Sequence, residues 1–366
     1  MQALILVGGE GTRLRPLTST IPKPVVPLVD RPVIAYMLEW LRAHGVDDVV
    51  MSCGFLAAGV RNVLGDGSGL GVRLRYVEEP HPLGTGGALK FAESLLDERF
   101  FMLNGDVLSD LDLSAQLAQH ERTGARGTLA LIAVDDPSGY GLVRLRGDNA
   151  IEEFVEKPSP DQIDTDLINA GAYVLDREVV SLIPPDTNFS IERDVFPELV
   201  DDGLFGYPAD GYWLDIGTPS RYLQATFDIL ERNVRTSVGE RLERSFLSVG
   251  EDVELEGRIV PPALVDDGCR IEADARIGSL AVLGPGVKVG RGSTIEQAVV
   301  LQGAEIGEEC RLRYCIVGAG ARVGDATRIE DGAVLGEGVT VGADNVLAHG
   351  ARVYPGVNLP DGAIRF

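Results

Sequence analysis

The sequence has no apolar run long enough to cross a membrane. None of its stretches reaches the roughly 18–20 consecutive apolar residues that a transmembrane helix needs. The run Ala3–Val7 is too short for the hydrophobic part of a secretory signal, and the glycine-rich segment 8–11 after it does not resemble a cleavage site. We therefore expect no membrane partner.

Cysteines and basic residues are scarce. The 4 cysteines form no Cys-x-x-Cys pair and show no metal-ligand spacing, which favours buried thiols in a reduced, cytoplasmic compartment. Only 33 Lys and Arg residues stand against 56 Asp and Glu residues, so the net charge is −23. This balance argues against non-specific binding to nucleic acid or anionic lipid. A small anionic substrate is still compatible with it, provided that a few cations are placed locally.

Up to about residue 232, short apolar strands alternate with helical segments. Strands are expected at 3–7, 48–52, 72–77 and 100–103, and helices at 32–44, 56–64, 88–96, 113–123, 191–200 and 220–231. This order predicts right-handed βαβ units in an α/β fold, a Rossmann-like and mostly parallel sheet with helices on both faces. The strand-rich stretch 128–174 predicts an antiparallel extension of that sheet.

The second part of the chain has a different period. Aliphatic residues recur every six positions from Val253 to Val353, with one-residue slips before Val300 and Val317. This pattern predicts a parallel β-helix of hexapeptide repeats, with the aliphatic side chains inward and Gly or Asp at the corners. A glycine-rich loop would not keep this register. We expect a first domain at 1–232, a connector at 233–252 and a β-helix at 253–366.

A glycine-rich segment follows the first expected strand. Gly8, Gly9 and Gly11 would let backbone N–H groups converge on an anion at the carboxyl edge of a sheet, and Arg13 adds charge. The segment is neither a P-loop nor a Gly-x-Gly-x-x-Gly motif, so a tight turn is the alternative.

The chain has only 4 lysines, and two of them stand beside proline. Lys23 lies in Pro-Lys-Pro, and Lys157 in Glu-Lys-Pro. A compact ammonium group can enter a phosphate cluster in which a guanidinium fork is too wide. The alternative is that both are ordinary surface lysines.

Two aspartates resemble ligands of a hard cation. Asp106 follows an expected buried strand, and Asp215 follows a short aromatic segment. Two carboxylates with few other ligands suit Mg²⁺, which keeps water molecules and binds phosphate oxygens. Turn or cap residues are the alternative.

Several motifs together resemble the nucleotidyltransferase family of sugar-nucleotide pyrophosphorylases. In order, they are GGEGTRLRPLT, PKP, EEPHPLGTGGAL, LNGD, FVEKP, INAGAYV and YWLDIGTP, over residues 1 to about 230. The tail, with YPGV and LPDG near its end, resembles the left-handed β-helix of members that make GDP-mannose from GTP and mannose 1-phosphate. The resemblance implies that an oxygen of a sugar 1-phosphate attacks the α-phosphorus of an NTP in line, pyrophosphate leaves, and Mg²⁺ assists.

The resemblance also implies roles for individual residues. The expected catalytic residues are Arg13 and Lys23, and the expected metal ligands are Asp106 and Asp215. The expected nucleotide-binding residues are Leu6, Gly8, Gly9, Gly11, Thr12, Glu79, Gly84, Thr85 and Gly87. The expected sugar-phosphate-binding residues are Gly141, Glu156, Lys157, Asn169 and Gly171.

Glu79 stands where thymidylyltransferase relatives carry a glutamine that pairs with the base. An ionised carboxylate accepts hydrogen bonds, and guanine offers the neighbouring N1–H and 2-amino donors. Uracil and thymine offer one donor flanked by acceptors, and a mispaired buried charge costs about 3–5 kcal/mol. Glu79 therefore favours guanine, unless Glu78 takes this role or Glu79 is a solvated residue at a strand end. No residue of the expected sugar pocket distinguishes mannose from glucose.

Other interpretations remain open. The chain could be a glucose-1-phosphate thymidylyl- or uridylyltransferase, or a regulatory subunit that binds nucleotide sugar without turnover. Hexapeptide β-helices also carry acyltransferases, for which His349 would be the candidate residue. Exposed β-helix edges favour a homo-oligomer.

Overall fold

The computed structural model describes residues 1–54 and 56–365, which form two compact units. Unit 1 contains Met1–Gly9 and Ile34–Trp213, and unit 2 contains Glu10–Val33 and the chain from Leu214 onward. The units therefore follow a different division of the chain from the expected domains. The segment after the first strand is grouped with the C-terminal part and not with the strand that precedes it.

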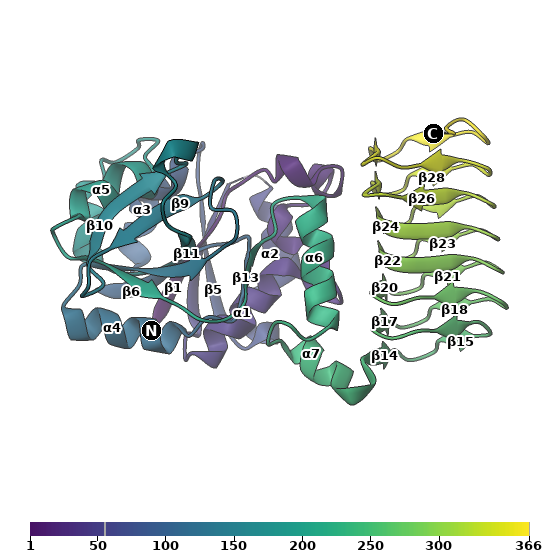
Figure 1. Ribbon diagram of the computed structural model, residues 1–366, viewed down its shortest axis with the longest axis horizontal. Helices are drawn as coiled ribbons and strands as arrows, with labels where there is room; N and C mark the ends of the chain where they lie inside the picture. The colour runs from purple at the N-terminus through teal and green to yellow at the C-terminus, as the bar shows by residue number, and fades with distance from the viewer. Residues whose placement is uncertain (55, 366) are drawn as a thin grey trace. The chain divides into compact units, whose positions relative to one another are not determined.

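A nine-stranded sheet forms the centre of unit 1 (Figure 1). Its order is β10-β9-β11-β6-β1-β4-β5, and β8 pairs with β11 and β12. The strands are β1 (Gln2–Val7), β4 (Asp48–Cys53), β5 (Arg73–Glu78), β6 (Arg99–Asn104), β8 (Gly127–Ala133), β9 (Gly141–Leu145), β10 (Ile151–Glu156), β11 (Leu167–Asp176) and β12 (Leu204–Pro208). Strand β1 is parallel to β4 and β6, whereas β11 is antiparallel to β6 and β8. The predicted parallel sheet with an antiparallel extension is confirmed.

The helices of this part of the chain are α1 (Val33–Ala43), α2 (Ala57–Leu64), α3 (Gly84–Ala92), α4 (Leu113–Thr123) and α5 (Phe196–Leu199). Leu89 and Ala92 of α3 share an apolar cluster with Leu4 of β1 and Phe100 of β6, so α3 covers the centre of the sheet. Helix α4 packs on β8, β11 and β12. The expected start of α3 at residue 88 is wrong, because the glycine-rich segment already forms its first turn.

Unit 2 contains a parallel β-helix, as the six-residue period predicts. The inward aliphatic residues from Val265 to Val353 form one buried cluster, and Val253 and Ile259 pack against it. Each strand pairs with its counterpart in the next coil, as Ile271 does with Val289. Burial of the repeat's aliphatic positions supplies the hydrophobic stabilisation of the whole stack.

The strands of the β-helix form three faces. The first has β14 (Leu247–Val249), β17 (Ala263–Val265), β20 (Ala281–Leu283), the ends of β22 (Thr294–Val300) and β24 (Arg311–Val317), β27 (Val334–Leu335) and β30 (Arg352–Val353). The second has β15 (Glu254–Leu255), β18 (Arg270–Ile271), β21 (Lys288–Val289), β23 (Glu305–Ile306), β25 (Arg322–Val323), β28 (Thr340–Val341) and β31 (Asn358–Leu359). The third has β16 (Arg258–Ile259), β19 (Arg276–Ile277), the starts of β22 and β24, β26 (Arg328–Glu330) and β29 (Val346–Leu347).

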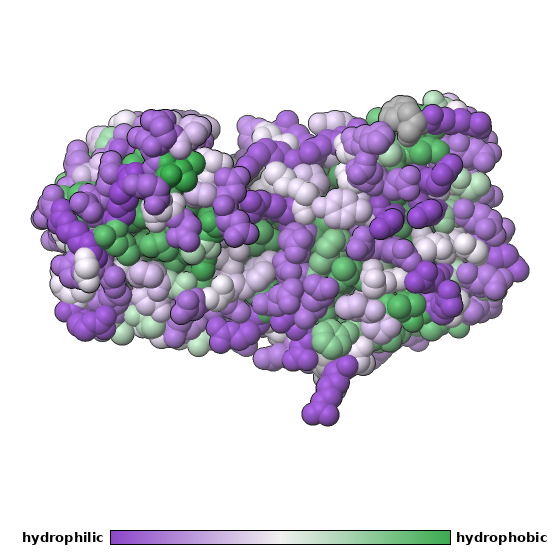
Figure 2. All heavy atoms as spheres, in the orientation of Figure 1, coloured by the Kyte–Doolittle hydropathy of each residue, from purple (hydrophilic) through white to green (hydrophobic). Residues whose placement is uncertain are grey.

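Helix α6 (Pro219–Leu230) packs on β22 and β24, and α7 (Ser237–Leu242) lies next in the chain. The ring centroids of Phe227 and Tyr314 are 6.3 Å apart at this contact. We call the first face of the β-helix the α6 face. Elsewhere the visible surface of the β-helix is mostly hydrophilic (Figure 2).

Two smaller expectations concern the whole chain. All four cysteines, Cys53, Cys269, Cys310 and Cys315, are free and buried, as predicted. Burial raises the pKa of Cys53 to about 12, so its thiol is protonated at neutral pH. Among the described residues, no helix is both long and apolar enough to span a membrane.

We expect Leu312→Ala to lower the free energy of unfolding by about 2–5 kcal/mol, because Leu312 is fully buried in the β-helix core. Thr294→Ala is the control, since Thr294 is a partly exposed residue of a neighbouring strand. Equilibrium urea unfolding of both variants measures the difference. Equal losses would contradict the assignment of Leu312 to the core.

Candidate active site

In unit 1, predicted nucleotide-binding residues lie at the carboxyl edge of the parallel strands. Leu6 in β1 pairs with Ser52 in β4 and with Asn104 in β6, so the ends of three strands are aligned. Gly8 and Gly9 directly follow β1. An added Cβ atom on Gly8 would lie 3.2 Å from Oε1 of Glu79, so a side chain at this position would require the carboxylate of Glu79 to shift slightly.

Glu79 is half-buried and hydrogen-bonded, whereas Glu78 is exposed. The hydroxyl of Ser52 donates to Oε1 of Glu79 at 3.0 Å, and the backbone N–H of Leu83 donates to Oε2 at 3.3 Å. Burial raises the pKa of Glu79 above its ordinary value of 4.5, and the two hydrogen bonds oppose this effect. This geometry disfavours a solvated strand-end glutamate and favours Glu79 over Glu78 as the base-reading residue.

Asp106 lies at the same edge of the sheet. It follows β6 after Asn104 and Gly105, and the N–H of Gly105 donates to the carbonyl of Leu6 at 2.9 Å. Gly171 in β11 is also close, because an added Cβ atom would lie 2.8 Å from Nδ2 of Asn104. Its φ of 71° independently favours glycine at this position.

The residues of the predicted sugar site lie on β9, β10 and β11, and Lys157 directly follows β10. Glu156 and Gly141 are paired residues, and an added Cβ on Gly141 would lie 2.9 Å from Oε2 of Glu156. Asn169 donates to the hydroxyl of the buried Tyr173 at 2.8 Å and accepts from the N–H of Gly171 at 3.0 Å. Asn169 is thereby held in one orientation.

Glu156 and Lys157 are adjacent in sequence but differ in exposure. Burial raises the pKa of Glu156 first, and the negative charge of Glu192 raises it further. Lys157 is exposed and has a left-handed φ of 54°. Sequence reasoning missed Glu192, which lies outside all the quoted motifs.

Gly84, Thr85 and Gly87 were expected at the base, and the structure gives them further contacts. The N–H groups of Gly86 and Gly87 donate to the carbonyl of Phe189 at 2.8 and 3.2 Å. The hydroxyl of Thr85 donates to Oε2 of Glu192 at 2.6 Å. This turn of α3 therefore packs closely against the segment 187–192.

Unit 2 carries the other predicted phosphate-binding residues. Gly11 has a left-handed φ of 62°, and an added Cβ atom would lie 3.1 Å from both Cβ of Lys23 and Cγ2 of Thr18. Lys23 is almost fully buried, with 9% of its surface exposed. Thr12, next to Gly11, is exposed. Gly11 and Lys23 are thus brought together, so Lys23 is not an ordinary surface lysine.

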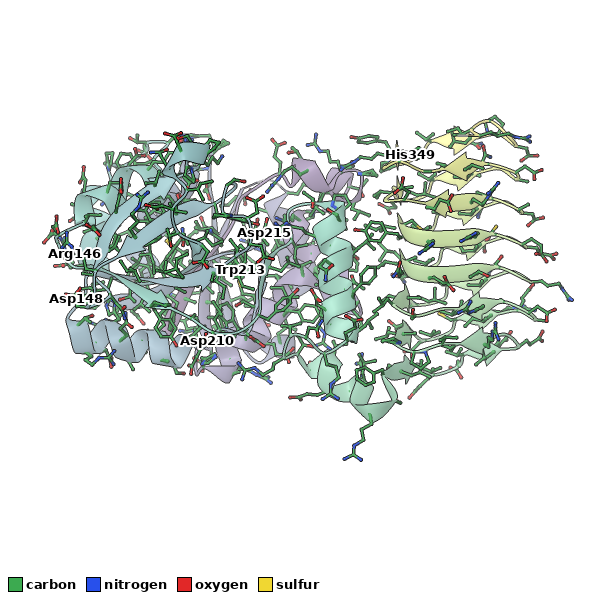
Figure 3. All side chains as sticks on the ribbon, in the orientation of Figure 1. Arg146, Asp148, Asp210, Trp213, Asp215 and His349 are labelled. Atoms are coloured by element: carbon green, nitrogen blue, oxygen red, sulfur yellow. The ribbon has the colours of Figure 1, made fainter. Side chains whose placement is uncertain are left out.

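Arg13 and Asp215 also meet within unit 2, although about 200 residues separate them in sequence. An added Cβ atom on Gly217 would lie 2.8 Å from Nη2 of Arg13 and 2.9 Å from Oδ2 of Asp215. Oδ1 of Asp215, which is labelled in Figure 3, accepts from Nη1 of Arg221 in α6 at 2.7 Å. Arg221 is a further residue that the sequence motifs did not indicate.

The carboxylates of Asp106 and Asp215 are suitable ligands for a hard divalent cation, because they offer only oxygen atoms. Across 1–54 and 56–365, no three His, Cys, Asp or Glu side chains are grouped as a complete metal site. A cation held by two carboxylates and by substrate phosphates does not require such a group.

His349 is an exposed turn residue of the β-helix (Figure 3). Its Nδ1 lies 2.8 Å from Oδ2 of Asp331 in the preceding coil, and its backbone N–H donates to the same oxygen at 3.1 Å. These contacts give His349 a role in the turn and add no support for an acyltransferase.

Comparison with known families identifies the chemistry of this fold. Residues 2–232 match the Nucleotidyl transferase family, and residues 259–362 match the GMPPB C-terminal domain. The chain belongs to the nucleotidyl transferase family.

Individual members of the family are similar over most of the chain. The mannose-1-phosphate guanylyltransferase of Mycobacterium tuberculosis is 38% identical over 100% of this chain and 98% of its own length. The UTP–glucose-1-phosphate uridylyltransferase of Synechocystis is 32% identical over 86% of this chain and 88% of its own length. The crystal structure of HddC from Yersinia pseudotuberculosis has a TM-score of 0.54 and 29% identity, covering 61% of this chain and 97% of that one.

We expect Glu79→Gln to change how stability depends on pH. With its raised pKa, the carboxyl of Glu79 ionises in the unfolded chain before it ionises in the folded nucleotidyl transferase. The unfolding free energy of the wild type should therefore fall relative to that of Glu79→Gln as the pH rises above about 4.5. Urea unfolding between pH 4 and 7 measures this difference, and the exposed Glu78→Gln is the control. A constant difference would show that Glu79 is solvated.

Proposed function

We propose that this nucleotidyl transferase converts GTP and mannose 1-phosphate into GDP-mannose and pyrophosphate. The similarity to a mannose-1-phosphate guanylyltransferase extends over the whole chain and includes the β-helix. The observation that carries the choice of guanine is the half-buried, oriented carboxylate of Glu79 beside Gly8. Its remaining lone pairs match the two adjacent donors of guanine.

The proposed reaction is an in-line displacement at the α-phosphorus. An oxygen of the sugar phosphate forms the new P–O bond, and the bond to the β-phosphate oxygen breaks as pyrophosphate leaves. Lys23 binds the α-phosphate and Arg13 the leaving pyrophosphate, so both stabilise charge that rearranges in the transition state. The segment Gly8–Thr12 binds the triphosphate through backbone N–H groups, and Gly84, Thr85 and Gly87 lie beside the base.

The sugar phosphate is proposed to bind beside β9, β10 and β11. Lys157 pairs with its phosphate. Glu156 accepts hydrogen bonds from the sugar hydroxyls, and Asn169 donates hydrogen bonds to them. Asp106 and Asp215 are the proposed ligands of Mg²⁺, which would neutralise phosphate charge when bound. Both aspartates are acceptors that a hard cation prefers, and Arg221 orients Asp215.

The proposal extends to the organisation of the protein. We take residues 1–232 as the catalytic domain, 233–252 as the connector and 253–366 as the β-helix. We further propose that the protein is cytoplasmic and that it forms a homo-oligomer through the β-helix.

The second candidate is a uridylyltransferase acting on glucose 1-phosphate. The similarity to the Synechocystis enzyme favours it, although that similarity is lower in identity and covers less of the chain. Glu79 argues against it, because uracil offers a carboxylate only one donor, which is flanked by two carbonyl acceptors.

Pyrophosphate release tests both specificities at once. GTP, dTTP, UTP, CTP and ATP are each combined with mannose, glucose and galactose 1-phosphates. We expect the highest kcat/KM for GTP with mannose 1-phosphate, and a smaller preference for GTP over UTP in Glu79→Gln. A uridine preference in the wild type would replace the proposal with its alternative, and an unchanged preference in Glu79→Gln would remove Glu79 from base recognition.

We expect Lys23→Ala to lower kcat by about 100-fold or more while changing the affinity for GTP far less. The reason is that the ammonium group acts mainly on charge that develops at the α-phosphorus. Steady-state kinetics and GTP titration measure the two effects. Lys288→Ala is the control, since Lys288 is an exposed lysine of the β-helix. Equal losses in kcat and in affinity would contradict this role.

A further inference from the structure

The outward row of the α6 face changes character at the last of its strands. The residues of this row are in register from coil to coil: Ser248, Leu264, Val282, Val299, Ile316, Val334 and Arg352. The five aliphatic members have at most 2% of their surface exposed. Arg352 occupies the position at which another aliphatic residue would continue the row.

Arg352 is hydrogen-bonded to the segment that carries Arg13. Its Nη1 donates to the carbonyl of Arg13 at 2.9 Å and also to the carbonyl of Arg15. The same two parts of the chain make a second contact, in which the hydroxyl of Thr20 donates to Oε2 of Glu337 at 2.7 Å. The last coils of the β-helix therefore hold residues 13–20 at two points.

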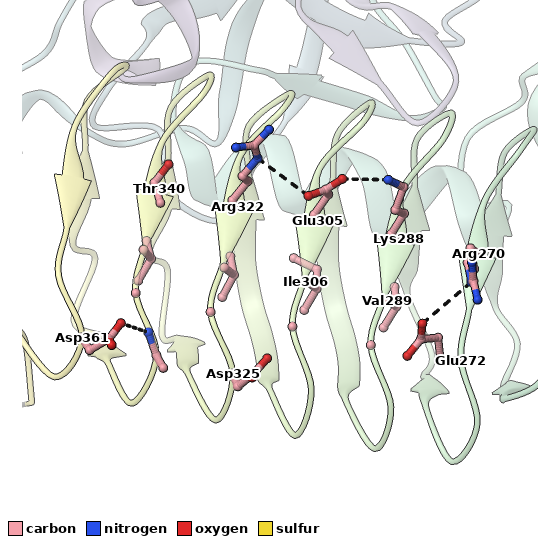
Figure 4. Close-up of a pocket in the computed structure, with 17 residues that line it drawn as sticks. Arg270, Glu272, Lys288, Val289, Glu305, Ile306, Arg322, Asp325, Thr340 and Asp361 are labelled. Atoms are coloured by element: carbon pink, nitrogen blue, oxygen red, sulfur yellow. Dashed lines mark hydrogen bonds and ion pairs between the residues drawn. The ribbon is translucent and has the colours of Figure 1, made fainter.

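The charged residues of the second face are paired differently from Arg352. On the second face, Glu305 accepts from Lys288 at 2.8 Å and lies 3.7 Å from Arg322 (Figure 4). Those charges pair with one another along the coils. Among the described residues, Arg352 has no acidic partner, and its hydrogen bonds go to backbone carbonyls. Charge-assisted bonds of this kind are stronger than neutral ones.

The held segment has little regular structure of its own. It consists of short 3-10 turns at Thr12–Leu14 and Leu17–Ser19. The hydroxyl of Thr18 donates to the carbonyl of Gly11 at 2.7 Å, which closes the segment at its start. Arg13 is an exposed residue whose Nη2 lies beside Gly217, and the backbone that carries it helps to set where its guanidinium lies. A misplacement of about 1 Å can cost a reaction about 100-fold.

We propose that Arg352 is a positioning residue for Arg13. By fixing the carbonyls on both sides of Leu14, it holds the Arg13 backbone at the place from which the guanidinium reaches the leaving pyrophosphate. The β-helix thereby contributes to turnover through one side chain. This inference rests on the proposed role of Arg13.

The test compares Arg352→Ala with Arg352→Lys in the full chain. Arg328→Ala is the matched control, because Arg328 is an exposed arginine of β26 on the third face. Hydrogen exchange of the amides of residues 11–20 reports whether the segment is held. Pyrophosphate release reports kcat and KM for GTP and mannose 1-phosphate.

For Arg352→Ala we expect faster exchange in residues 11–20 and a fall in kcat of about 10–100-fold, with KM for mannose 1-phosphate within about twofold. Arg352→Lys should restore part of the exchange protection and part of kcat, since an ammonium group donates hydrogen bonds but lacks the guanidinium fork. Arg328→Ala should change neither. Thr20→Val removes only the second contact, and it serves as the test variant if Arg352→Ala fails to fold. We expect Thr20→Val to accelerate amide exchange in residues 11–20 as well.

Unchanged exchange in Arg352→Ala would overturn the inference, and so would faster exchange with an unchanged kcat. A wild-type chain that released no pyrophosphate from any substrate pair would instead remove the proposed function and, with it, the role of Arg13. Exchange would then still decide whether Arg352 holds the segment, so the two failures are distinguishable.

Discussion

Parallel pairing of β1 with β4 and β6 is the constraint on which the candidate site of unit 1 depends. Parallel strands that are paired in register end at the same edge of a sheet. That edge receives Gly8 from one strand and Asp106 from another, and Glu79 follows a third. Without this alignment, Gly8, Glu79 and Asp106 would not be brought to the same edge of the sheet.

Unit 2 has an equivalent constraint in the β-helix. The inward aliphatic stack fixes the coils, and the outward row of the α6 face provides an apolar surface for α6. Helix α6 in turn carries Arg221, which binds Asp215. The C-terminal half is therefore structurally connected to residues of the proposed chemistry, and the hydrophobic pattern of the repeat is the origin of that connection.

The sequence predicted the elements well where a period was strong. The strand at 3–7, the helix at 113–123 and the six-residue repeat all agree with the structure. It failed at the start of α3, because glycine has a low helix propensity and tertiary contacts with Phe189 override it. For the site, it indicated Glu79 and Asp215 through motifs but not Glu192 or Arg221, which belong to no recognisable pattern.

The two architectures, the family and the residue types available for phosphate chemistry were predictable from the amino-acid sequence, because periodicity and short motifs are local properties of the chain. The folded structure was needed to establish which glutamate is half-buried, which arginine orients Asp215, and where Arg352 donates its hydrogen bonds. Burial and hydrogen-bond partners arise from contacts between residues far apart in the chain, and a single sequence carries no direct record of those contacts.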